Sequence, residues 1–144
     1  MGATNSFESE VLRHIFLNED IANIGDAGGL LQSIVDGNLY VALFTISPGE
    51  AGEITNEAVY TGYARIAVAR GGAGWVEDEG SIHNAAVIIF PECAGASETI
   101  THFGICKSLA GDDMIIHGAL PAPALIFAGI QPQYGVNGLV INLD

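Results

Sequence analysis

The sequence predicts a mainly β protein, in which an antiparallel β-sandwich or jelly-roll-like domain follows a helical N-terminal arm. Short apolar runs, rich in β-branched and aromatic residues, recur from residue 39 onward and are bounded by Gly, Pro, Asn or Asp. The 19 glycines fall mostly between these runs, without the strict period of collagen, which is typical of many turns. We therefore expect an N-terminal helical arm and loop over residues 1–38 and a β-sandwich domain over residues 39–144.

The arm begins with the spacing of an amphipathic helix over residues 6–17. Phe7, Val11 and Ile15, with Leu12 and Phe16, recur at three- and four-residue spacing and form one apolar stripe. A lone amphipathic helix must bury its stripe, either against its own β-domain or against a neighbouring subunit. We therefore predict that the side chains of Phe7, Val11 and Ile15 lie in an interface.

The rest of the arm is predicted to be a loop followed by a second, short helix. Residues 18–29 are polar and punctuated by glycine, which is typical of a loop. The helix is predicted to end near Gly37. Its apolar positions are Leu30, Leu31, Ile34 and Val35. Of these, Leu30 and Leu31 are further candidate interface residues.

Seven runs in the β-domain are predicted to be strands. Their bounds are residues 39–46, 63–69, 81–90, 98–106, 114–120, 125–128 and 139–143. In the last run Leu139, Ile141 and Leu143 share one face, as a half-buried strand requires. Strands at this spacing favour an antiparallel sandwich or barrel. Ile126 and Phe127 fall in the sixth run, where they could seal a subunit interface, although burial in the domain's own core is the simpler interpretation.

The charge of the chain limits its partners. The formal net charge is −13, from 17 acidic and 4 basic residues. Binding to nucleic acid depends on Lys and Arg that displace counterions, and an anionic membrane repels an acidic domain. We therefore expect neither a nucleic-acid nor a membrane partner. The acidity favours solubility before assembly, and a basic protein partner is the alternative explanation.

The sequence carries no recognisable catalytic motif. There is no nucleophile elbow and no phosphate-binding loop with its lysine. His83, His102 and His117 supply zinc ligand types, but their spacing does not match a structural zinc site. Acidic residues gather in glycine-bounded turns, where solvated turns are the simpler interpretation than glycosidase carboxylates or a calcium loop. We predict no catalytic residue, no cofactor and no metal ligand.

Three other side chains have two possible interpretations each. Trp75 is the only tryptophan, and it could either stack on a sugar or pack inside the domain. Cys93 and Cys106 could form a disulfide, but we expect two reduced, buried thiols.

A series of short motifs gives a family resemblance. In order, they are Tyr40-Val-Ala-Leu-Phe-Thr45, Pro48-Gly-Glu-Ala-Gly52, Gly62-Tyr-Ala-Arg65, Phe90-Pro91, Thr101-His-Phe-Gly-Ile105 and Gly118-Ala-Leu120. Their order and spacing from residue 39 to residue 144 resemble those of small tailed-phage virion proteins described as tail-fibre-like or capsid-decorating. Two segments depart from that family, residues 18–38 and residues 121–132, and we expect both to face different neighbours.

The resemblance implies a non-enzymatic structural protein located in the virion, without a cofactor. On this basis we expect a capsid decoration or cement protein that stabilises the particle through self-association, with a trimer favoured. Its expected partner is the major capsid protein or another virion protein. The alternatives are a tail, neck or fibre component, or a β-sandwich recognition module that binds sugar or a host receptor.

Overall fold

The computed structural model describes residues 1–143, and contacts between these residues divide the chain into two compact units. Unit 1 comprises residues 1–38, 69–87 and 134–143, and unit 2 comprises residues 39–68 and 88–133. The chain therefore passes between the units several times. The expected division into an N-terminal helical arm, residues 1–38, and a β-sandwich domain, residues 39–144, stays a prediction.

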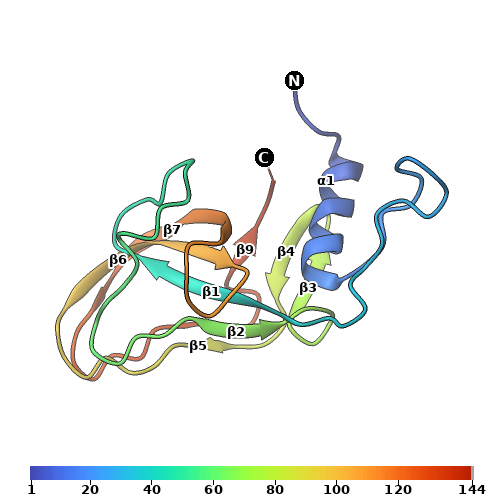
Figure 1. Ribbon diagram of the computed structural model, residues 1–144. Helices are drawn as coiled ribbons and strands as arrows, with labels where there is room; N and C mark the ends of the chain where they lie inside the picture. Colours follow the sequence, from blue (N-terminus) through green and yellow to red (C-terminus); the bar gives the residue numbers. More distant parts are fainter. Residues whose placement is uncertain (144) are drawn as a thin grey trace. The chain divides into compact units, whose positions relative to one another are not determined.

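Unit 1 begins with the helix that the sequence predicts (Figure 1). The α-helix α1 (Asn5–Leu12) continues into one turn of π-helix, η1 (Arg13–Leu17). Thr4 caps the start, because its hydroxyl accepts from the Phe7 amide at 3.3 Å. The helix ends at Asn18, which adopts the left-handed conformation with φ 57°. The predicted bounds, residues 6–17, are thus confirmed to within one residue.

Only part of the predicted stripe is buried in this helix. Leu12 and Phe16 are fully buried, and the Phe16 ring meets the ring of Trp75 edge-on at a centroid distance of 4.8 Å. Phe7, Val11 and Ile15 keep part of their surface in solvent. Within unit 1 the stripe is therefore only partly covered.

The sheet of unit 1 has three antiparallel strands in the order β3–β4–β9. These are β3 (Trp75–Asp78), β4 (Ser81–Asn84) and β9 (Val140–Ile141). Asn84 is completely buried, and its side-chain amide donates to the carbonyls of Ala86 and Gly135 at 2.8 Å each and accepts from the Leu139 amide at 2.8 Å. These bonds tie β4 to the C-terminal segment.

One predicted element of unit 1 is wrong. Residues 30–37 form no helix, because side-chain oxygens accept hydrogen bonds from backbone amides of this segment. The Asn18 carboxamide oxygen accepts from the Ser33 amide at 2.7 Å, and the Asp20 carboxylate accepts from the Gln32 amide at 2.6 Å. The segment is instead an extended loop beside α1 (Figure 1).

Unit 2 is built on a four-stranded antiparallel sheet in the order β2–β1–β6–β7 (Figure 1). The strands are β1 (Asn38–Phe44), β2 (Ile66–Ala69), β6 (Glu98–Cys106) and β7 (Met114–Ile126). Ala42 pairs with Gly104, and Phe103 pairs with Gly118. A Cβ at Gly118 would lie 2.7 Å from the Phe103 ring, so this glycine admits the aromatic ring.

The strand predictions vary in accuracy. Residues 98–106 match β6, whereas the separate strands predicted at 114–120 and 125–128 are one continuous β7. β7 is the last strand in the sheet order of the described residues. Pro121 and Pro123 fall where its pairing with β6 is irregular, between the pairs Ile100–Ala124 and His102–Ala119. The predicted strand at 81–90 is divided into β4 and β5 (Ile88–Ile89), and β5 pairs with β8 (Gln133–Tyr134).

The predicted fold class is confirmed. The described residues are mainly β, their sheets are antiparallel, and a short α-helix lies near the N-terminus. No helix in the described part of the chain has the length and apolar character needed to cross a membrane.

Candidate functional site

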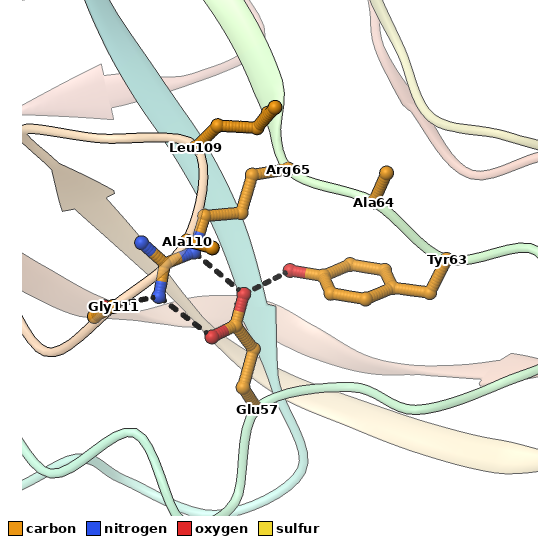
Figure 2. Close-up of a pocket in the computed structure, with 7 residues that line it drawn as sticks. All are labelled: Glu57, Tyr63, Ala64, Arg65, Leu109, Ala110 and Gly111. Carbon is orange, nitrogen blue, oxygen red and sulfur yellow. Dashed lines mark hydrogen bonds and ion pairs between the residues drawn. The ribbon is translucent and has the colours of Figure 1, made fainter.

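The best-defined polar cluster of unit 2 surrounds Arg65, the residue before β2 (Figure 2). The Arg65 side chain is only 2% exposed. Its Nε and Nη2 each donate to one carboxylate oxygen of Glu57 at 2.8 Å, which is a two-point ion pair. Glu57 is held in place because its backbone forms a bridge with Phe44 at the end of β1.

The remaining donors of Arg65 hold the loop between β6 and β7. Nη1 donates to the Ser108 carbonyl at 3.0 Å and to the Asp113 carboxylate at 3.4 Å, and Nη2 also donates to the Gly111 carbonyl at 2.8 Å. An arginine side chain has five N–H donors, and each of them is used here. The loop is thereby fixed to the residue that precedes β2.

Tyr63 completes the cluster, which we call the Arg65 clamp (Glu57, Tyr63, Arg65 and Asp113). The Tyr63 hydroxyl donates to Glu57 Oε1 at 2.8 Å and accepts from the Leu43 amide at 3.1 Å. Burial raises the pKa of Tyr63 above its usual value, and the hydrogen bonds to Glu57 raise the pKa of Arg65. Tyr63 therefore stays neutral and Arg65 stays charged throughout the physiological pH range.

The clamp forms part of the wall of a cavity of about 310 Å³. Leu109, Ala110 and Gly111, from the loop between β6 and β7, also line it (Figure 2). A binding or catalytic site needs polar groups that are free to meet a ligand. Here the charged groups are engaged with one another, and we interpret the cluster as a structural device that orders the loop between β6 and β7.

The three candidate zinc-ligand histidines lie on different strands. His83 is in β4 of unit 1, and His102 and His117 are in β6 and β7 of unit 2. His102 Nδ1 lies 2.8 Å from the Thr101 hydroxyl. No group of three or more His, Cys, Asp or Glu residues within residues 1–143 is arranged to hold a metal ion.

Trp75 is a core residue and not a sugar platform. Its side chain is completely buried in unit 1, so that neither face of the indole is open to a ligand. The alternative interpretation, in which this ring stacks on a sugar, is therefore wrong.

Both cysteines are free and buried, as expected. Burial raises the pKa of the Cys106 thiol to about 11. At pH 8 only about one such thiol in a thousand is ionised, and the thiolate is the reactive form. We therefore expect a thiol-reactive disulfide reagent to label the native protein far more slowly than the urea-unfolded chain, in which both cysteines react. Rapid labelling of the folded protein would show that at least one of the two thiols is accessible.

The predicted interface residues occupy different environments. Ile126 is buried in unit 2, whereas Phe127 beside it is about half exposed. In unit 1, Leu30 and Leu31 are exposed on the loop that follows η1, together with two residues that the sequence assigned to a helix, Ile34 and Val35. The role of these residues in an interface stays a prediction.

Sequence reasoning missed the polar residues that order the loops. Glu57 and Asp113 lie 8 and 48 residues from Arg65, so no local motif joins them. The available signal was the scarcity of basic residues, since only 4 Lys and Arg accompany 17 acidic residues. In a chain with so many carboxylates, an arginine is expected to form an ion pair, although the sequence does not identify its partner.

Comparison with known proteins places the chain in a phage family. No curated protein matches it significantly. A family model described as "Podophage GP4 fiber I protein gp80" matches residues 34–142, which is most of the chain and includes the Arg65 clamp. The chain therefore belongs to the podophage GP4 fiber I protein gp80 family and is a fibre-type phage virion protein.

Proposed function

We propose that this protein is a non-enzymatic component of a tail fibre and that it acts through contacts with other virion proteins. The match to a fibre I family over residues 34–142 carries this proposal. The ordering of the loops supports it, because the hydrogen bonds of the Arg65 clamp join protein groups to one another. This role replaces the capsid decoration role that we favoured from the sequence, and it corresponds to the alternative considered there.

Self-association is part of the proposal, with a trimer as the favoured form. β7 lies at the end of the four-stranded sheet, and the described residues leave one of its edges without a neighbouring strand. Leu125 and Phe127 are exposed at its C-terminal end. Exposed apolar side chains beside an open strand edge favour association between copies. Sedimentation of the purified protein should therefore give a trimer, and a monomer at all concentrations would contradict this part.

A binding experiment distinguishes the fibre role from the capsid role. Purified protein is mixed either with tails or with empty capsids from the same phage, both prepared without this protein, and the particles are pelleted. We expect the protein to pellet with tails and to stay in solution with capsids. Binding to capsids alone would support a decoration role, and binding to neither would overturn the proposed function.

A further inference from the structure

The loop between η1 and β1, which Figure 1 shows beside α1, carries exposed apolar side chains in unit 1. Its members, which we call the apolar ridge, are Leu30, Leu31, Ile34 and Val35, with exposed fractions of 45%, 69%, 105% and 76%. Single exposed apolar residues are common on protein surfaces, but four within six residues form a patch. Such a patch is typical of a binding surface.

Asn18 holds the segment that carries the ridge through its side-chain amide. Its side-chain nitrogen donates to the Ser33 carbonyl at 2.9 Å and to the Asp36 carboxylate at 2.8 Å, while its side-chain oxygen accepts from the Ser33 amide at 2.7 Å. Asn18 is itself buried. The two polar anchors, Ser33 and Asp36, flank Ile34 and Val35 on either side in the sequence. The backbone of these two apolar residues is therefore fixed at both ends.

Arg70 holds the same segment through further hydrogen bonds. Its guanidinium donates to the carbonyls of His14 and Ile15 at 2.7 and 2.6 Å, at the end of the helix. It also donates to the Ser33 hydroxyl at 3.1 Å and to the Asp36 carbonyl at 3.2 Å. One side chain thus joins the helix to the ridge. All of these residues belong to unit 1.

The early part of the loop is closed by backbone pairing. Ile21 and Leu30 exchange two N–H···O bonds of 2.9 Å. Gly29 has φ +64°, and a Cβ at this position would lie 1.9 Å from the Ile21 carbonyl oxygen, so only glycine fits here. The pairing sets the position of Leu30 at the beginning of the ridge.

This arrangement lowers the cost of binding. A flexible loop loses conformational entropy when a partner orders it, whereas a loop that is already ordered does not. The polar groups of the framework are used within unit 1, and the apolar side chains remain available for contact. Burial of exposed Leu, Ile and Val then favours association directly.

The charge around the ridge indicates the kind of partner. Residues 14–64 contain no Lys or Arg, whereas residues 19–36 contain Glu19, Asp20, Asp26 and Asp36. Two arginines lie near this segment: Arg70 donates to the Ser33 hydroxyl and the Asp36 carbonyl, and Arg13 is paired with Glu19 at 2.7 Å and with Glu77 at 3.4 Å. The four carboxylates of residues 19–36 outnumber these two arginines. A second copy of this chain would bring the same negative charge to the contact, which costs energy at close range. A basic surface is complementary.

We propose that the apolar ridge docks into an apolar groove, rimmed by Lys or Arg, on a different virion protein. The inference rests on the proposed function and adds the attachment surface and the chemistry of its partner. Leu30 and Leu31 lie before the part of the chain that matches the family, residues 34–142. The ridge therefore combines residues from within and outside the family match.

The ridge can be tested by complementation. A phage whose own copy of this gene carries an early stop codon is grown on bacteria that supply the protein, so that all copies in a particle are the same variant. The amount of this chain per major capsid protein is then measured by mass spectrometry in purified particles. For the double variant Ile34→Ser with Val35→Ser we expect a loss of about tenfold or more, because two apolar side chains no longer contribute to binding.

The matched control is Val59→Ser, which changes an equally apolar side chain that is 79% exposed in unit 2. This control should be incorporated like the unaltered protein. Circular dichroism should show that both variants fold, and sedimentation should show an unchanged oligomeric state. An unaltered protein that is itself missing from the particles would overturn the proposed function and the docking surface with it.

Two other results would overturn the inference alone. Normal incorporation of the ridge variant would show that the ridge is not the attachment surface. A ridge variant that loses its oligomeric state would show that the ridge contacts a second copy and not a basic partner protein.

Discussion

Replacement of Arg65 by alanine is expected to lower the free energy of unfolding by about 3–5 kcal/mol, the cost of breaking a buried ion pair by removal of one partner. The Arg65 side chain is 2% exposed and Glu57 is 16% exposed, so water cannot fully replace the lost contacts. The change leaves the Glu57 carboxylate with only the Tyr63 hydroxyl as a side-chain donor, and it removes the arginine donor from the carbonyls of Ser108 and Gly111. Urea unfolding followed by far-ultraviolet circular dichroism measures the effect.

Arg13→Ala is the matched control. Arg13 also forms ion pairs, with Glu77, which is 12% exposed, at 3.4 Å and with Glu19 at 2.7 Å. In the shorter pair the two side chains are 44% and 42% exposed. Exposed pairs of this kind contribute about 0–1 kcal/mol. Equal losses for Arg65→Ala and Arg13→Ala would show that the Arg65 clamp does not stabilise unit 2 as a buried ion pair.

Trp75→Ala is expected to lower the free energy of unfolding by about 3–5 kcal/mol, as removal of a large buried aromatic side chain does. The indole is completely buried, and its edge-on contact with Phe16 joins η1 to β3 within unit 1. The same urea titration measures this loss, and a separate assay with sugars should show no difference between variant and unaltered protein.

Trp75→Phe gives a graded comparison. Phenylalanine keeps an aromatic ring in the same space, and it removes an indole N–H that has no hydrogen-bond partner among the described residues. We therefore expect a smaller loss than for alanine. A stability loss below about 1 kcal/mol for Trp75→Ala would show that this part of unit 1 is not a packed core.

Sequence patterns predicted the elements whose apolar spacing and boundary residues lie within the element itself. The helix at residues 6–17 has regular apolar spacing and a left-handed asparagine at its end, and β6 is a long run with a clear boundary on each side. The short strand β3 was missed, because its sequence, Trp-Val-Glu-Asp, has only four residues and two of them are charged. Its pairing with β4 in a hairpin, and not its composition, makes it a strand.

The predicted second helix shows the limit of such reasoning. Leu30, Leu31, Ile34 and Val35 have helical spacing, but Asn18 and Arg70, which lie outside that segment, take up its backbone polar groups. The Arg65 clamp was missed for a similar reason, because the fold brings Asp113, from the loop between β6 and β7, to members in the connection between β1 and β2. The motifs of residues 39–144 predicted a phage virion protein, and the family match confirms this, while the distinction between head and tail has no signature in residue patterns.

The location of the protein on the intact phage tests the proposed fibre role most directly. A short epitope tag is added to the protein, and gold-labelled antibody is located on purified virions by electron microscopy. The proposed function predicts gold on the tail and its fibres and none on the faces of the capsid. Gold distributed over the capsid surface would contradict a fibre role.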